Sequence, residues 1–123
     1  MPSVLVVDDD KDLRDVVRVV LEHSGFTVSE ATNGLEALRK LEARSVDLIV
    51  LDVFMPELGG IGFLENLPAR FRKIPVIAMS GGADRGVSEP LQRAQKLGAA
   101  RVFPKPFEVQ ALEQAARELT AKP

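Results

Sequence analysis

The chain has 123 residues, 46% of them hydrophobic and 28% charged, so it is long enough for one buried core and too short for two. Its formal net charge of -2 excludes the broad basic face that general nucleic-acid binding requires, and the absence of cysteine excludes disulfides and thiolate metal sites. No signal peptide or membrane-spanning run is visible, so we expect one cytoplasmic domain over residues 1–123 that binds neither nucleic acid nor membrane.

The amino-terminal segment predicts a strand followed by a helix. Residues 4–7 are apolar and mostly β-branched, which is typical of a buried strand, and apolar residues then recur with helical spacing. The expected core-facing residues of this helix are Leu13, Val16, Val17, Val20 and Leu21. We expect Asp10 to cap the helix, Gly25 to end it, and residues 26–31 to form a second strand.

A second helix and a third strand follow. Asn33 precedes Glu36 by three residues, which is the pattern of a capped helix start. The expected core-facing residues of this helix are Leu35, Leu38 and Leu41. Residues 48–51 form an unbroken aliphatic run, which predicts a strand buried on both faces, and Asp52 ends it. Because Pro56 turns the chain just beyond, this carboxylate is expected at the mouth of a sheet.

The carboxyl-terminal half continues the alternation. We expect a short helix over 61–67, a strand over 75–79 closed by Ser80, and a helix within 88–98. Residues 101–103 predict a brief fifth strand. The final helix is expected to turn one side to the core, and that side is formed by Phe107, Ala111, Leu112, Ala115 and Leu119.

Five alternations of strand and helix predict the α/β class, with a doubly wound parallel sheet covered by helices on both faces. In such sheets, ligands bind at the carboxyl ends of the strands. The polar residues that the predicted strands carry to this end are Asp8, Asp9, Asp52, Ser80 and Lys105.

Three of these residues are carboxylates, which repel one another by roughly 4 kcal/mol per pair at about 4 Å and an effective dielectric of about 20. They are therefore expected to take up protons or a cation. An all-oxygen site favours magnesium, manganese or calcium, and magnesium suits a shallow, open site. With the ion bound, Asp52 is a plausible nucleophile towards phosphorus, and Lys105 and Ser80 can stabilise charge on the phosphoryl oxygens.

Together these motifs resemble a receiver domain of a two-component response regulator, of the single-domain, chemotaxis-regulator-like type, over nearly the whole chain. The matching residues are Asp8-Asp9, Asp52-Val53-Phe54-Met55-Pro56 with Gly60, Ser80, and Lys105-Pro106-Phe107. The resemblance implies a flavodoxin-like sheet of five strands, order 2-1-3-4-5, with five helices. We expect a stand-alone phosphoacceptor, not a turnover enzyme, that signals by altered partner binding.

By this resemblance, Asp52 would accept a phosphoryl group from a histidine kinase or a histidine phosphotransfer protein. The phosphorylated domain would then bind a downstream protein target. Asp9 would bind magnesium, or manganese, directly and Asp8 would bind it through water. Asp52 and the backbone carbonyl of Phe54 would complete the protein ligands, and the two groups that contact the phosphoryl oxygens would be Lys105 and Ser80.

Two features depart from the family pattern. Val102 stands where an aromatic residue is usual, and Phe103 cannot replace it because neighbouring strand residues point to opposite faces. The segment 80–98 is longer than usual and rich in glycine, so we expect the signal to pass through rearrangement of this loop and the helix after it.

Two other functions fit part of the pattern. Val102 favours a receiver-like binding module that is never phosphorylated. An aspartate-dependent phosphatase of the haloacid dehalogenase type would use Asp8 and Asp10 as its Asp-x-Asp pair, but Asp12 stands where that family has Thr or Val. Each polar residue taken singly also has an ordinary explanation as a cap, a turn residue or a solvated side chain.

Overall fold

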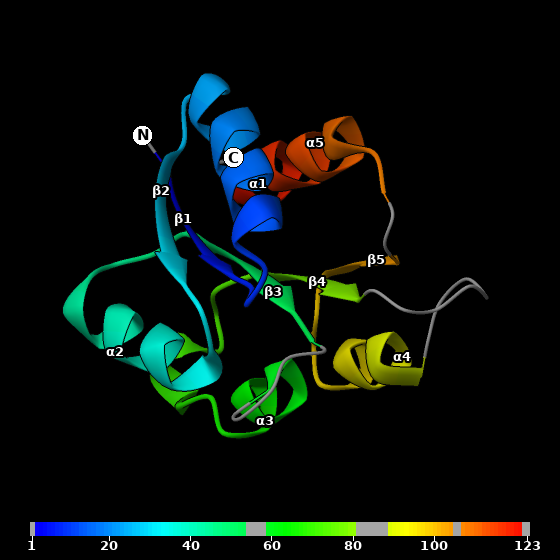
Figure 1. The fold of residues 1–123 in the computed structure, drawn as a ribbon. Coiled ribbons are helices and arrows are strands. Elements are labelled where there is room, and N and C mark those ends of the chain that lie inside the picture. Colours follow the sequence, from blue (N-terminus) through cyan, green and yellow to red (C-terminus); the bar gives the residue numbers. More distant parts are fainter. Residues whose placement is uncertain (1, 54–58, 81–88, 105–106, 122–123) are drawn as a thin grey trace.

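Helices and strands alternate along the computed structural model, which describes residues 2–53, 59–80, 89–104 and 107–121 (Figure 1). The strands are β1 (Ser3–Val7), β2 (Thr27–Ala31), β3 (Leu48–Asp52), β4 (Val76–Ser80) and β5 (Arg101–Pro104). The helices are α1 (Lys11–His23), α2 (Gly34–Ala43), α3 (Gly60–Glu65), the 3-10 helix η1 (Ala69–Phe71), α4 (Glu89–Lys96) and α5 (Val109–Thr120). The predicted alternation is confirmed, and η1 is an element that the sequence did not predict.

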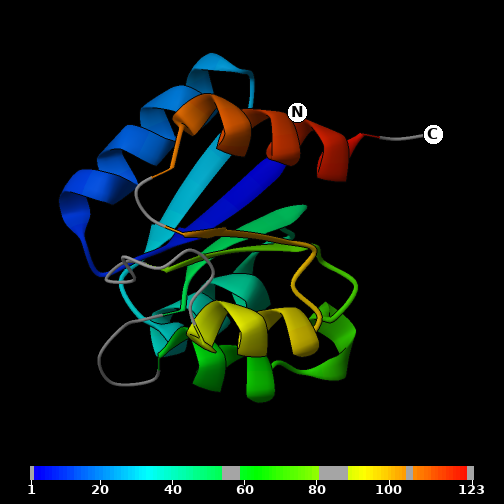
Figure 2. The ribbon, with the colours of Figure 1, turned by 90° about the vertical axis from the view of Figure 1, so that its right-hand side faces the viewer.

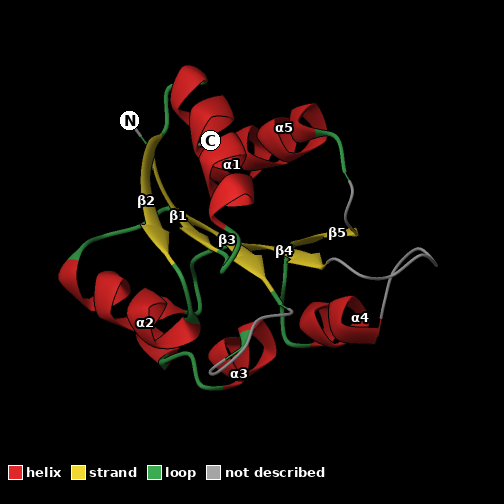
Figure 3. Ribbon diagram, viewed as in Figure 1, coloured by secondary structure: helices red, strands yellow, loops and turns green. Residues whose placement is uncertain are grey.

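The strands form one parallel sheet of order β2-β1-β3-β4-β5, which confirms the expected flavodoxin-like arrangement (Figure 3). The central strand is β3, where Leu51 lies opposite Val7 of β1 on one side and Ala78 of β4 on the other. All of β3 is buried, because helices cover both faces of the sheet. This burial explains why residues 48–51 show no alternation of polar and apolar side chains.

Helices α1 and α5 lie on one face of the sheet, and α2, α3 and α4 lie on the other (Figure 2). Because side chains alternate along a strand, neighbouring residues of β3 enter different cores. Leu51 packs in the cluster that contains Phe63 of α3, whereas Val50 packs in the cluster that contains Leu21 of α1 and Leu112 of α5. The sheet therefore separates two hydrophobic cores.

Caps and left-handed residues set several helix ends where the sequence predicted them. The Asp10 carboxylate accepts hydrogen bonds of 3.0 and 3.4 Å from two backbone N-H groups in the first turn of α1. Asn33 accepts one of 2.9 Å in the first turn of α2. Gly25 and Gly98 follow α1 and α4 with φ of 98° and 109°, a conformation that residues with a Cβ avoid.

Three residues that we expected in the core are exposed. Val16 and Leu35 are 48% and 51% exposed, and Ala111 is exposed as well. The predicted burial was wrong because each helix contacts the sheet through a stripe narrower than its apolar spacing suggests. In α2 this stripe runs through Ala37 and Leu41, and Leu35 lies two residues, or about 200° of helical rotation, from Ala37.

Two helix boundaries also differ from the prediction. Helix α3 ends at Glu65 instead of 67, because Pro68 disfavours the helical conformation in the residue before it, and the N-H of Leu67 instead closes a tighter turn on Leu64 at 3.4 Å. Phe107 precedes α5, and its ring centre lies 5.7 Å from that of Phe103. The predicted cap Ser88 lies outside the described residues. None of the helices within the described ranges has the length and hydrophobicity that crossing a bilayer requires.

Candidate functional site

Three neighbouring strands carry polar residues at their carboxyl ends. Asp8 follows β1, Asp52 ends β3 and Ser80 ends β4, and these three strands are neighbours in the sheet. Asp52 lies opposite Met79, so Ser80 stands one residue beyond it on the adjacent strand. Asp8, Asp52 and Ser80 are all buried, with exposed fractions of 0%, 4% and 1%. Polar groups buried together in this way need partners or a ligand.

The acidic residues form a compact cluster with the composition of a metal site. One carboxylate oxygen from each of Asp8, Asp9 and Asp52 lies within 4.8 Å of the others, and Asp9 alone of the three is exposed. Oxygens bound to one magnesium ion at about 2.1 Å stand at most about 4.2 Å apart, so small side-chain rotations would bring these onto a single ion. These three carboxylate oxygens are hard donors, and the cluster is open to solvent on the side of Asp9. Such a set of ligands fits magnesium or manganese.

The backbone and side chain of Asp8 are held from three directions. Its N-H donates to the carbonyl of Ala31 at 3.1 Å, and its Oδ1 accepts a hydrogen bond of 2.9 Å from the N-H of Asp10. Its carbonyl accepts one of 2.8 Å from Nη1 of Arg14. The sequence analysis did not single out Arg14, although a cation between Leu13 and Val17 in an apolar stripe is the signal that could have found it.

A close backbone contact fixes the chain at the end of β3. A Cβ atom at Gly60 would lie 2.3 Å from Cα of Val53 and 2.4 Å from the carbonyl oxygen of Asp52, so only glycine fits there. The N-H of Val53 continues the ladder past the strand by donating to Met79 at 2.8 Å. The absence of a side chain at Gly60 therefore lets α3 begin against the acid-bearing strand.

The exposed rim of the cluster carries a cation as well as acids. Nζ of Lys11 lies 2.9 Å from Oδ2 of Asp15, and the hydrogen bond and charge of Asp15 raise the pKa of this ammonium above its ordinary value. Lys11 is therefore charged at neutral pH. Two other expected site residues, Lys105 and Phe54, lie outside the described residues.

The two residues that depart from the family pattern in β5 face opposite ways, as expected. Val102 packs against the core beneath α2, α3 and α4, whereas Phe103 packs against the core beneath α1 and α5. Phe103 is thus on the wrong face to take the place of an aromatic residue at 102. Most of the glycine-rich segment after Ser80 lies outside the described residues.

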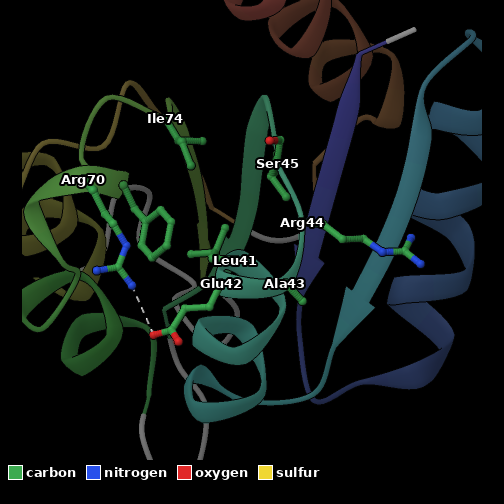
Figure 4. Close-up of a pocket in the computed structure, with 9 residues that line it drawn as sticks. Leu41, Glu42, Ala43, Arg44, Ser45, Arg70 and Ile74 are labelled. Atoms are coloured by element: carbon green, nitrogen blue, oxygen red, sulfur yellow. Dashed lines mark ion pairs between the residues drawn. The ribbon is translucent and has the colours of Figure 1, made fainter.

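A separate hollow of about 400 Å³ lies near the amino ends of β3 and β4, at the opposite end of the sheet from the acids (Figure 4). Its walls are Leu41, Glu42, Ala43, Arg44, Ser45, Val46, Arg70, Phe71 and Ile74. Arg70 lies 3.4 Å from Glu42 and stacks 4.7 Å from the ring centre of Phe71. Because it shares no residue with the acidic cluster, this hollow is not part of the candidate site.

The chain is similar to known signalling proteins over the parts that form this cluster. Residues 4–117 match the family described as response regulator receiver domain. A transcriptional regulatory protein, the CpxR homolog of Haemophilus influenzae, is 40% identical over 107 residues, covering 87% of this chain and 45% of the relative. An NtrX-like response regulator of Rickettsia bellii is 36% identical, covering 85% of this chain and 22% of the relative. The chain thus spans less than half the length of these two relatives.

Solved structures with the same fold cover nearly the whole chain. The receiver domain of the Francisella response regulator 1452 superposes with a TM-score of 0.86 at 32% identity, covering 98% of this chain and 97% of that one. The chemotaxis protein CheY4 of Vibrio cholerae has a TM-score of 0.84 at 28% identity and covers 97% of this chain and 98% of its own.

Proposed function

Because the chain belongs to the response regulator receiver domain family, we propose that Asp52 accepts a phosphoryl group from a histidine kinase or a histidine phosphotransfer protein. Receiver domains take phosphoryl groups from histidine kinases and bind magnesium at an acidic cluster. The observation that carries the proposal is the meeting of Asp8, Asp9 and Asp52, from separate parts of the chain, within 4.8 Å. Asp52 is buried at the end of the central strand.

In the proposed reaction, a carboxylate oxygen of Asp52 attacks the phosphorus of a phosphohistidine. A new O-P bond forms, the P-N bond breaks, and its electron pair stays on the imidazole nitrogen, which takes up a proton. The products are an aspartyl phosphate and free histidine. Water then cleaves the aspartyl phosphate, which releases inorganic phosphate and restores the carboxylate. We regard the domain as a phosphoacceptor and not as a turnover enzyme because its own side chain carries the phosphoryl group as the signal.

We assign the metal and phosphoryl contacts as follows. Asp9 and Asp52 would bind magnesium directly, Asp8 would bind it through water, and the backbone carbonyl of Phe54 would complete the protein ligands. The bound ion would neutralise charge that develops on the phosphoryl oxygens. Donors from the protein would be the Ser80 hydroxyl, placed one strand away from Asp52, and the Lys105 ammonium.

The output would be a change in the binding of a downstream protein segment, on the same chain or another. Asp52 ends the central strand of the sheet, and helices cover both faces of that sheet (Figure 2). Phosphorylation there would therefore affect elements on both faces. The relatives include a transcriptional regulatory protein, which is the kind of longer protein in which such a domain acts.

Treatment of the protein with acetyl phosphate and magnesium tests the proposal. Intact mass should rise by about 80 Da in the wild type and in Asp12→Asn, which removes an exposed acid near the site, but not in Asp52→Asn. A mass increase that persists in Asp52→Asn would place the phosphoryl group elsewhere. No increase in the wild type would favour the unphosphorylated binding module, and catalytic release of phosphate from a phosphoester would favour the phosphatase.

A further inference from the structure

A largely buried ion pair ties the acidic loop to the edge of the sheet. Arg14 of α1 donates from Nη1 to the backbone carbonyl of Asp8 at 2.8 Å and from Nε to Oε1 of Glu30 in β2 at 3.0 Å. The Arg14 side chain is only 12% exposed, and that of Glu30 is 22% exposed. One planar guanidinium therefore links the loop after β1 to the neighbouring strand.

The bond to Asp8 lies where the ladder of the sheet ends. The N-H of Asp8 still pairs with Ala31 of β2, but β1 itself stops at Val7, and it is Arg14 that bonds the Asp8 carbonyl. A peptide bond is planar, so holding this carbonyl also fixes the N-H of Asp9 and the direction in which the chain enters that residue. Arg14 thus acts on the backbone between two of the clustered acids.

We propose that Arg14 is a positioning residue for the metal site. By holding the peptide between Asp8 and Asp9, it keeps both carboxylates in reach of Asp52 and so raises the affinity for magnesium. The inference rests on the proposed function, because it takes the acidic cluster to be the magnesium site. Outer residues that orient metal ligands have effects of this kind in other proteins, although they do not touch the ion.

Charge alone would make Arg14 act in the opposite sense. A cation near the cluster repels a divalent ion, so its removal would strengthen magnesium binding if geometry did not matter. Positioning predicts the reverse, a weaker affinity when Arg14 is replaced. The sign of the change therefore distinguishes the two effects.

Arg18 provides a matched control one turn further along α1. Its Nη1 donates to the other carboxylate oxygen of Glu30 at 2.8 Å and its Nε to Glu22 at 3.2 Å. Its side chain is 46% exposed, and among the described residues it makes no hydrogen bond to Asp8. Replacing Arg18 removes the same charge and a bond to the same Glu30, but leaves the Asp8 carbonyl held.

The test is a magnesium titration of the full chain, followed by the amide NMR signals of residues 8–10 and 52–53. Arg14→Met should weaken magnesium binding about 10-fold, at the lower end of the range for residues that orient ligands. Arg14→Lys should weaken it similarly, because a single ammonium cannot reproduce the planar fork that reaches two acceptors. Arg18→Met should change the affinity by no more than about 2-fold.

Unchanged or tighter binding in Arg14→Met would overturn the inference, and so would an equal loss in Arg18→Met, because the network would then be merely structural. If Arg14→Met does not fold, Glu30→Gln tests the same link by weakening the second anchor of the guanidinium. It should lower the affinity about 2- to 3-fold more than Asp12→Asn, which removes a like charge near the site without touching Arg14, and equal changes in the two variants would count against positioning. Wild-type protein that does not respond to magnesium would instead overturn the proposed function, which is a distinguishable result.

Discussion

The two ends of the sheet use charge in opposite ways. At the carboxyl end, buried Asp8 and Asp52 and exposed Asp9 bring carboxylate oxygens within 4.8 Å of one another, so acids of one sign are collected and two of them are out of water. At the amino end, Arg70 and Glu42 form a pair of opposite sign whose side chains are 64% and 59% exposed, beside the hollow of Figure 4. Like charges held together cost stability, whereas an exposed pair contributes little. The difference supports the proposal that the ion and the phosphoryl group bind at the carboxyl end.

Gly60→Ala should give the largest effect, because it breaks the backbone contact on which the carboxyl end depends. The new Cβ would stand 2.3 Å from Cα of Val53, and we expect the free energy of unfolding to fall by about 3 kcal/mol or more. Urea unfolding measures this loss.

Gly25→Ala is the control for backbone strain without a clash. Gly25 has a φ of 98° and no atom within 4 Å of its would-be Cβ, so the expected loss is about 1 kcal/mol. Equal losses in the two variants would show that the close approach of α3 to β3 has no particular importance.

Magnesium should stabilise the folded protein through the carboxyl end alone. At a concentration 100 times its dissociation constant, the ion should raise the free energy of unfolding by about 2.7 kcal/mol. Asp9→Asn should remove most of this gain, whereas Glu42→Gln at the other end should retain it. Urea unfolding with and without magnesium gives the difference, and a gain that survives in Asp9→Asn would move the ion away from the cluster.

Without metal, neutralising one acid should have opposite signs at the two ends. Asp9→Asn relieves repulsion and should raise the free energy of unfolding by about 0.5 kcal/mol, a small value because Asp9 is exposed. Glu42→Gln loses its pairing with Arg70 and should lower it by at most about 0.5 kcal/mol. Unfolding in the presence of a chelator measures both, and the same sign for both variants would contradict the contrast.

The smallest effect concerns an exposed pair that lies at the carboxyl end. Asp15 raises the pKa of Lys11 above 10.5, so the contribution of this pair is complete below that pH and is lost as pH rises through the higher folded value. The stability difference between wild type and Lys11→Met should therefore shrink as the pH rises above about 10.5. A constant difference would mean that the pair contributes nothing to stability.

Local signals predicted the alternation of strands and helices and the residues at the strand ends, whereas the strand order was an expectation from the family resemblance. The aliphatic run before Asp52 and the capping pattern at Asp10 each lie within a few residues. The α/β class follows from the alternation of such strand and helix patterns along the chain. Burial on the helices was harder to predict. Leu35 has the spacing of a core residue, and only the packing of α2 on the sheet decides that Ala37 faces inward in its place.

The parts of the site that could not be predicted depend on contacts between distant segments. Arg14 is an ordinary helix residue until α1 is placed beside the end of β1, where its guanidinium meets Asp8 and Glu30. The role of Gly60 likewise requires the path of α3 relative to β3. The position of Arg14 in an apolar stripe can mark it as unusual, but spacing in the sequence identifies neither its partners nor those of Gly60.

The division of the apolar interior by the sheet has a consequence for how the protein can change. Leu41 and Leu21 belong to different clusters, so truncating both should cost the sum of the separate losses, within about 0.5 kcal/mol. Substitutions beneath α1 and α5 therefore need no compensating substitutions beneath α2, α3 and α4. The residues on the two sides of the sheet can therefore change independently of each other. One surface can adapt to a new partner while the opposite surface stays unchanged.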